Sequence, residues 1–380
     1  MQSALSMPAK ALLAVAGGGK TQKIADQIST LPSDSRTLSV TYTTNGQNEL
    51  ASRLLSSGEL LTRCETLGWY SLLLRHVIKP YLPAIFSDVH PRGLQFIGSS
   101  SEIPRTRSGW RFYFNDQGDA YSNRISVLAN KIIAKTKGAP IDRLSGIFDY
   151  LFIDEVQDLC GNDLDITRAL MRSRINVFVV GDARQALFNT STSDQKYKQF
   201  RGARIADWLR QLDSSGHCEL TESSETRRFN ATIAAVSDLV HDPDLNFPKT
   251  ISSETTNTGH DGVFLVDTRD LAQYVEEFSP TILRARSDLG GDFECEVLNF
   301  GEAKGLTRDR VAIISTAPIR SWLTTGQPLA ESAQGKFYVA LTRSRYSSAI
   351  IADNAAQLYG NLRHELTQHV KLHPSRTAEN

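Results

Sequence analysis

The sequence predicts an α/β protein with two lobes, each built on a parallel sheet with helices on both faces. Short apolar runs bounded by turn residues alternate with segments of helical period, which is the pattern of repeated strand–helix–strand units. The chain has 380 residues, enough for two domains with separate cores. Its hydrophobic fraction of 40% and charged fraction of 22% are those of a globular protein.

The first lobe is assigned to residues 1–213. A strand over residues 11–16 leads through a Gly-rich turn into a helix that runs to Ile28. Residues 88–120 interrupt the lobe with Pro, Gly, Ser and aromatic residues, and we interpret them as a small inserted subdomain. Further apolar runs predict strands at residues 38–43, 150–153 and 177–180.

The second lobe is assigned to residues 214–380. A segment rich in Pro, Ser, Thr and Asn, residues 242–261, is expected to be a loop or linker. In the first lobe, polar residues follow the predicted strands, at the ends where open parallel sheets bind their ligands. The strands expected in this lobe are residues 263–266, 281–283, 311–314 and 349–351.

Composition excludes several classes of function. Lys and Arg number 42, as do Asp and Glu, so the total charge does not indicate a nucleic-acid binder, although a local basic groove could exist within it. No apolar stretch is long enough for a membrane span and no signal peptide is visible, so we expect a cytoplasmic protein. The four cysteines are far apart, which argues against a zinc knuckle or a disulfide framework: Cys64, Cys160, Cys218 and Cys295.

The segment Ala14–Thr21 has the pattern of a phosphate-binding loop. Three glycines follow a strand and precede a helix, so that backbone N–H groups and the helix N-terminus can surround a triphosphate. Lys20 would reach the β- and γ-phosphates and Thr21 would hold Mg²⁺. The strict pattern has Gly where this chain has Ala14, and the alternative is an ordinary turn before a helix. The glycines are Gly17, Gly18 and Gly19.

Acidic residues follow the strand at 150–153. Asp154 could hold Mg²⁺ and Glu155 could orient or deprotonate the attacking water. A solvated acidic loop is the alternative for this segment alone. Together with the phosphate-binding loop, it predicts an NTPase, an enzyme that binds a nucleoside triphosphate with Mg²⁺ and hydrolyses it.

From Asp154–Asp158 onward the chain resembles the UvrD/Rep-type helicases of superfamily 1. The resemblance implies two RecA-like lobes of the P-loop NTPase fold that hydrolyse ATP between them. The motifs occur in the order of that family, from Ala14 to Arg343. They are residues 41–45, 180–185, 200–203, 227–229, 303–306 and 338–343.

The resemblance also implies roles for single residues. Gln185 would sense the γ-phosphate, while Arg228 and Arg343 would neutralise its charge during phosphoryl transfer. The alternative for both arginines is an ordinary surface ion pair. Either Arg227 or Arg228 could occupy the position of the family's arginine. Gly305 belongs to a segment that links nucleic acid to nucleotide. The residues implied to contact a single strand or a tailed duplex of DNA are Thr44, Phe200 and Lys304.

Two further clusters leave alternatives open. Lys196, Tyr197 and Lys198 could stack on bases and hold phosphates, or could form a solvated loop. The aromatic residues 110, 112 and 113 could stack on bases, although a small hydrophobic cluster explains them better.

The chain also departs from the family pattern. The stretch from Arg228 to Lys304 is too short for the large accessory domain, and Asn299 and Gly301 replace the usual Thr-x-His pair. Small proteins of this kind include the UvrD-like helicase subunit of Gabija-type antiphage systems, which works beside an OLD-family nuclease subunit. Two functions therefore stay open: a DNA helicase or single-strand translocase, and a nucleotide-driven switch that regulates a partner nuclease without unwinding.

Overall fold

The computed structural model describes residues 8–42, 44–56, 64–97, 108–187, 190, 194, 196–286 and 293–374. By its internal contacts the chain divides into two compact units. The first contains Met1–Leu13, Lys20–Ala183 and Phe188–Thr221, and the second contains Ala14–Gly19, Arg184–Leu187 and Glu222–Asn380. Two short segments, residues 14–19 and 184–187, therefore group with the second unit although the chain around them belongs to the first.

The first unit is built on a six-stranded sheet of order β3-β2-β6-β7-β1-β8. Its ladders β2–β3, β2–β6, β6–β7 and β1–β7 are parallel, so the carboxyl ends of these strands share one edge. The strand β7 separates β1 from β6, which brings the segments after three strands to neighbouring positions. The strands are β1 (Ala9–Ala14), β2 (Thr37–Thr41), β3 (Cys64–Gly68), β6 (Tyr150–Ile153), β7 (Asn176–Gly181) and β8 (Cys218–Ser223).

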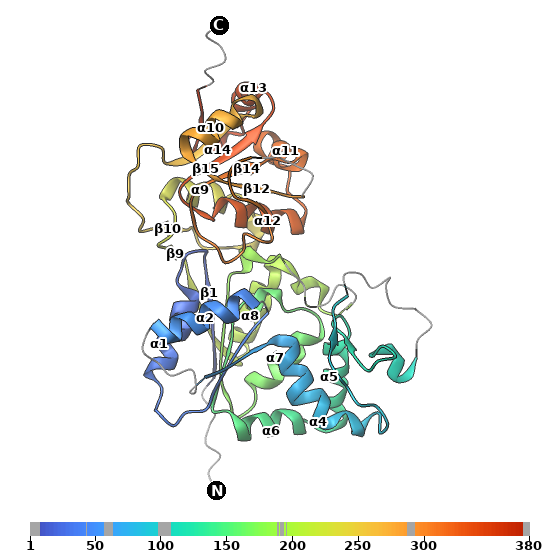
Figure 1. Ribbon diagram of the computed structural model, residues 1–380. Coiled ribbons are helices and arrows are strands. Elements are labelled where there is room, and N and C mark those ends of the chain that lie inside the picture. The colour runs from blue at the N-terminus through green and yellow to red at the C-terminus, as the bar shows by residue number, and fades with distance from the viewer. Residues whose placement is uncertain are drawn as a thin grey trace. The chain divides into compact units, whose positions relative to one another are not determined.

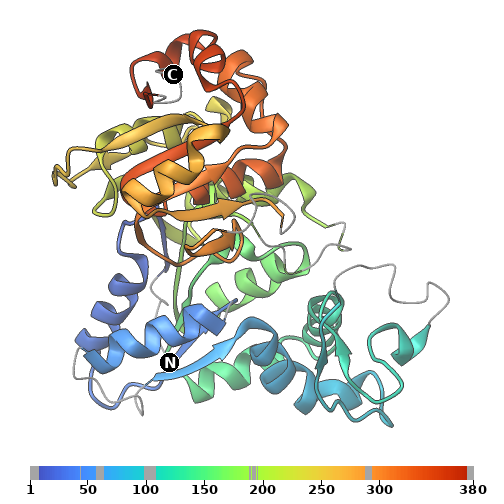
Figure 2. The same ribbon diagram turned by 45° about the horizontal axis from the view of Figure 1, so that its top comes forward.

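The helices of the first unit follow its strands, as the alternation in the sequence predicts. The segment from Trp69 to Tyr81 is one continuous helical stretch in which a π-helical part, Leu73–Ile78, joins α3 and α4. Figure 2 shows α1 and α2 side by side on the first sheet. The helices are α1 (Lys20–Thr30), α2 (Thr44–Ser56), α3 (Trp69–Leu72), α4 (Lys79–Tyr81), α5 (Ile125–Lys135), α6 (Ala139–Ile147), α7 (Asn162–Met171) and α8 (Ile205–Ser214).

The inserted segment projects from one side of the first unit (Figures 1 and 2). Within its described residues, β4 (Leu94–Gln95) pairs in parallel with β5 (Ala120–Tyr121). The rings of Phe112 and Tyr113 meet edge to face at 4.9 Å, and Tyr113 is buried. These contacts favour a small hydrophobic cluster over a surface for stacking bases.

The second unit is built on a six-stranded sheet of order β13-β12-β14-β15-β11-β16, and all five of its ladders are parallel. The predicted α/β class with two parallel sheets is thus confirmed. The strands of this sheet are β11 (Gly262–Asp267), β12 (Thr281–Arg284), β13 (Val297–Asn299), β14 (Arg308–Ile314), β15 (Ser344–Ala352) and β16 (Val370–Leu372).

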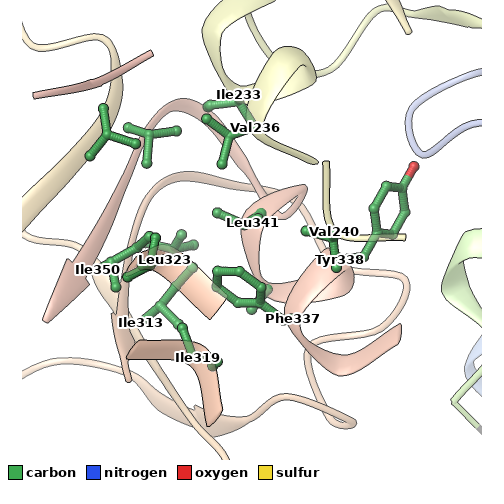
Figure 3. Packing of buried hydrophobic residues seen from close by; sticks show 14 of the residues in the cluster. Ile233, Val236, Val240, Ile313, Ile319, Leu323, Phe337, Tyr338, Leu341 and Ile350 are labelled. Atoms are coloured by element: carbon green, nitrogen blue, oxygen red, sulfur yellow. The ribbon is translucent and has the colours of Figure 1, made fainter. Parts of the chain in front are cut away.

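Helices cover both faces of the second sheet. Successive residues of a strand point to opposite faces, and accordingly Val263 and Leu265 pack in one cluster whereas Phe264 and Val266 pack in another. Figure 3 shows the first cluster, in which Phe337 points among aliphatic side chains. The helices are α9 (Ala231–Asp238), α10 (Leu271–Phe278), α11 (Ala317–Thr325), α12 (Glu331–Leu341), α13 (Ala355–Gly360) and α14 (His364–Thr367).

The segment expected as a linker, residues 242–261, is short of regular structure but is attached to the second unit. Its strand β10 (Ile251–Ser252) pairs in parallel with β9 (Glu225–Thr226). The side chain of Asp238 accepts hydrogen bonds from the amide and hydroxyl of Thr250, at 2.7 and 2.6 Å. These bonds fix the segment beside α9.

Candidate nucleotide-binding and catalytic residues

The glycine loop Ala14–Gly19 packs closely on the segment that contains Arg228. Gly17 has φ +76°, and a Cβ there would lie 2.5 Å from both Arg228 Cβ and Thr226 Oγ1. Only glycine satisfies both the backbone conformation and the close approach. Gly19 also has a positive φ, +71°, but a Cβ there would meet nothing within 4 Å. Arg227 N donates to Gly17 O at 3.2 Å, which ties the loop to the same segment.

A second contact to the glycine loop comes from α12. The amide of Ala16 lies 3.3 Å from the hydroxyl oxygen of Tyr338, both of them buried. Figure 3 shows Tyr338 at the margin of the aliphatic cluster, with its hydroxyl pointing away from Phe337. The loop is therefore held by groups from two elements of the second unit.

In the first unit, Lys20 opens α1 and faces the end of β7. Its Nζ lies 3.8 Å from Asp182 Oδ2, and the Asp182 side chain is only 3% exposed. This ion pair holds the ammonium group of Lys20 near the end of β7. The hydroxyl-bearing Thr21 follows it in the first turn of the helix and is half-buried.

Asp154 and Glu155 stand directly after β6. The amide of Asp154 donates to Val40 O at 2.8 Å, which continues the ladder with β2 for one residue. Burial, and then the neighbouring charge of Glu155, raise the pKa of Asp154 to about 7. A buried carboxylate whose charge is so poorly compensated suits a divalent cation, and the oxygen ligands that Asp154 and Thr21 offer are those that Mg²⁺ prefers.

The backbone turns sharply at Glu155, which adopts φ +56°, an unusual conformation for a residue with a side chain. The turn directs the half-buried Glu155 away from the path of the strand. The Nε2 group of Gln157 donates to Glu155 Oε2, and Gln157 Oε1 accepts from the amide of Asp182 at 3.0 Å. Gln157 therefore bridges the segments after β6 and β7 and orients the Glu155 carboxylate.

Gln185 and Arg343 form a pair in the second unit. The Nη2 group of Arg343 donates to Gln185 Oε1 at 3.3 Å, and both side chains are buried. The guanidinium also donates to Val339 O at 3.1 Å and to Leu306 O at 3.2 Å. Buried arginines need such partners, and here these bonds fix the plane of the guanidinium next to Gln185, the glutamine to which the family resemblance gives a role in phosphate sensing.

Arg228 and Arg227 differ in environment. Arg228 is half-buried and its Nη1 donates to Thr342 O at 3.4 Å, next to Arg343. The Arg227 side chain is 79% exposed and lies 3.9 Å from Glu225 Oε1. Of the two registers that the sequence leaves open, only that of Arg228 directs an arginine toward Thr342 and the glycine loop.

The residues expected to contact nucleic acid differ in how far they reach the surface. Phe200 and Lys304 are buried, with 8% and 7% of their surface exposed. Thr44 is the first residue of α2, and its side chain lies outside the described part of the chain. Gly305 has φ +86° in the turn before Leu306, whose carbonyl accepts from Arg343.

The loop with Lys196 and Tyr197 is attached to α7. Tyr197 donates its hydroxyl proton to Asp165 Oδ1 at 2.7 Å, and Lys196 Nζ pairs with the other oxygen of the same carboxylate. Asp194 Oδ2 accepts from the amide of Asn162 at 2.8 Å, where α7 begins. These bonds give Lys196 and Tyr197 partners within the protein, whereas Lys198 is exposed.

Two residues of this arrangement, Asp182 and Gln157, lie in the motif segments 180–185 and 154–158, but the sequence assigned no role to either. Asp182 directly follows an apolar strand, which is the signal that could have identified it. The role of Gln157 could not be found in this way, because it depends on a contact between two strand ends. Within the described ranges no three His, Cys, Asp or Glu side chains gather as a metal site, and no helix there is long and apolar enough to cross a membrane.

Comparisons with known proteins give similar solved structures and one matching family model. Two solved structures of the Arterivirus helicase, nonstructural protein 10, are similar to it. The first has 16% identity and a TM-score of 0.46; the second, a complex with DNA, has 15% and 0.44. Both similarities cover 93% of this chain and 62% of the viral protein, so the chain spans less than two thirds of the length of that helicase.

No curated protein matches the chain in sequence. Residues 116–210 match the family model of the UvrD/REP helicase N-terminal domain. The matched stretch of this chain contains Asp154, Glu155 and Gln185.

Proposed function

We propose that this protein is a UvrD/Rep-like ATPase that moves along single-stranded DNA as a translocase or helicase. The observation that carries the proposal is the arrangement at the carboxyl edge of the first sheet. Lys20 after β1, Asp154 and Glu155 after β6, and Asp182 after β7 stand on three adjacent strands. The match of residues 116–210 to the helicase domain supports the same assignment.

In the proposed reaction the first unit supplies the groups for binding and hydrolysis. Lys20 binds the β- and γ-phosphates, and Asp182 holds its ammonium group in place. Thr21 and Asp154 would hold Mg²⁺, which when bound neutralises phosphate charge. Glu155 accepts a proton from the attacking water, and Gln157 keeps its carboxylate oriented.

The second unit supplies donors for the charge that develops on the phosphates. The Cβ atom of Arg228 lies next to Gly17. The guanidinium at the end of this side chain can therefore reach phosphates that the glycine loop binds. Arg343 and Gln185 form a coupled pair that would respond to the γ-phosphate together. Fixed donors of this kind stabilise the transition state of phosphoryl transfer.

Turnover of ATP measured with and without a single-stranded oligonucleotide tests the proposal. We expect several-fold stimulation by the strand, and loss of nucleotide binding in Lys20→Ala. Lys23→Ala is the matched control, because Lys23 is exposed on the same helix. An ATPase rate that DNA and RNA leave unchanged would contradict the translocase assignment.

Burial of Phe200 and Lys304 favours a second candidate function. A nucleotide-driven switch that regulates a partner nuclease needs the ATPase groups but not an exposed path for a strand. Strand displacement on a tailed duplex separates the two functions, since product formed by the isolated chain excludes the pure switch.

The finer assignment extends the same proposal to antiphage defence. The resemblance of residues 181–186, 196–202 and 337–345 to Gabija-type subunits supports an OLD-family nuclease as the partner. Co-purification of this chain with such a nuclease, and loss of protection against phage in Glu155→Gln, would support it. Protection that persists in Glu155→Gln would contradict a role for ATP hydrolysis in defence.

A further inference from the structure

The second sheet has a cavity of about 500 Å³ at its carboxyl edge. It lies beyond the ends of β11, β14 and β15, whose final residues are in register, with Ile351 paired to both Val266 and Ile314. The floor is apolar and includes Leu271, Ile314 and Ile351. A cavity of this size is in the range of small-molecule sites, which combine an apolar body with a few polar groups.

The cavity is distinct from the groups assigned to ATP hydrolysis. Arg343 precedes β15, whereas Ala352 ends it, and the strand has nine residues. At about 3.3 Å per residue, its two ends are roughly 25 Å apart. The helices α10, α11 and α13 follow these three strands, whereas α12 precedes β15 and leads to Arg343.

The topology explains why a crevice opens here. After β14 the chain enters α11, whose Ile319 and Leu323 pack on one face of the sheet. After β11 it enters α10, whose Leu271 and Tyr274 pack on the opposite face. The chain thus leaves β11 and β14, on either side of β15, toward opposite faces, and such a switch point is where open α/β sheets bind ligands.

Two guanidinium groups line the cavity. Arg320 Nη1 donates to the carbonyl and hydroxyl oxygens of Ser315, at 3.0 and 3.3 Å, while its Nη2 makes no hydrogen bond to any described residue. Arg269 is held by Asp267 through bonds of 2.9 and 3.3 Å, although its side chain is 71% exposed. Asp267 is itself occupied, since it also accepts from the amides of Arg269 and Ala355. Both arginines are therefore oriented by the protein and keep donors for a ligand.

The start of α11 adds to this positive character. The helix has nine residues, and its N-cap residue Thr316 makes no side-chain capping bond. The first amides of a helix are unsatisfied donors that favour anions, although in α11 the second residue, Pro318, has no N–H. Ser315, at the end of β14, adds a hydroxyl to the same wall of the cavity.

We propose that this cavity binds a small organic phosphate, with the phosphate between Arg269 and Arg320 and the organic part on the apolar floor. Phosphate is a compact anion with several oxygens, and guanidinium groups bind it, as they bind carboxylate, with two parallel hydrogen bonds. Asp353 at the rim accepts hydrogen bonds from hydroxyl or amino groups of the organic part. The site is independent of the glycine loop, and its ligand could regulate the ATPase through α12, which joins α11 to Arg343.

Equilibrium dialysis of the full chain with labelled AMP tests the site. We expect AMP to bind wild type and Lys20→Ala equally, and to bind Arg269→Glu and Arg320→Ala at least about tenfold more weakly, as expected for the loss of a charge-assisted hydrogen bond. Arg345→Ala is the control, because Arg345 is 52% exposed near the opposite end of β15. The exposed position of Arg269 keeps the test valid if Arg320→Ala fails to fold.

Adenosine and inorganic phosphate, used as separate probes, test the two parts of AMP individually. We expect adenosine to bind at least about tenfold more weakly than AMP, and phosphate to compete with AMP. Equal binding of adenosine and AMP would overturn the assignment of the arginines to phosphate. Absence of AMP binding would overturn the site itself. Binding lost in Lys20→Ala but kept in both arginine variants would also overturn it, while leaving the proposed ATPase intact.

Discussion

Gly17 is required both by its backbone conformation and by its close approach to Arg228 and Thr226, and alanine substitutions can separate these two effects. Gly17 and Gly19 both have positive φ, +76° and +71°, so alanine at either position carries a backbone cost of about 1–2 kcal/mol. Only at Gly17 would the new Cβ also meet Arg228 Cβ and Thr226 Oγ1, both at 2.5 Å. Overpacking of this kind costs about 1–3 kcal/mol.

The difference between the two variants can be measured by hydrogen exchange with mass spectrometry, without nucleotide. Two backbone hydrogen bonds report on the contact. The amide of Val15 donates to Ser223 O, and the amide of Arg227 donates to Gly17 O, both at 3.2 Å. Gly17→Ala should speed exchange in residues 222–228 about 5- to 150-fold beyond Gly19→Ala, which is the extra 1–3 kcal/mol expressed as an opening constant. Equal exchange in the two variants would refute the proposed packing of the loop against the Arg228 segment.

Three further predictions rest on single contacts. Burial, and then the charge of Arg184, lower the pKa of His241 to about 3. As the pH falls from 6.5 toward 3, the imidazole is therefore protonated in the unfolded chain before it is protonated in the folded one, and the second unit should lose stability. Denaturant unfolding followed by Trp322 fluorescence measures this loss, which should be smaller in His241→Gln. If His241→Gln leaves the acid slope unchanged, another group causes it. Asp194→Ala removes the acceptor for the first amide of α7 and should cost that helix about 1 kcal/mol, seen as faster exchange of its first turn; unaltered protection would exclude the cap. Arg343→Lys keeps the charge but not the fork of donors to Val339, Leu306 and Gln185, so ATP turnover should fall at least about tenfold, and full activity would show that charge alone suffices.

Strands buried on both faces were the most predictable elements. The apolar run at residues 150–153 coincides with β6, and those at 177–180 and 263–266 fall one residue short of β7 and β11 at each end. Such strands read as continuous hydrophobic runs because helices cover both faces. The strands that escaped prediction lie at sheet edges. An example is β8, whose sequence Cys-Glu-Leu-Thr-Glu-Ser is largely polar and half exposed.

The candidate site was predictable where local sequence decides the geometry. Glycines before a helix and acidic residues after a strand identify Lys20 and Asp154 by position alone. The role of Gln157 escaped prediction because its bond to the amide of Asp182 joins segments 25 residues apart. The burial of Phe200 and Lys304 was equally hidden, since it depends on how distant segments pack around them.

The most direct test of the account is single-turnover hydrolysis of ATP by Glu155→Gln. The account predicts that this variant still binds ATP, because Lys20 and Asp154 remain in place, and that it cleaves the nucleotide about 100-fold more slowly than wild type, through loss of a positioned base. Cleavage at the wild-type rate would contradict the assignment of Glu155 and, with it, the proposed reaction at the end of β6.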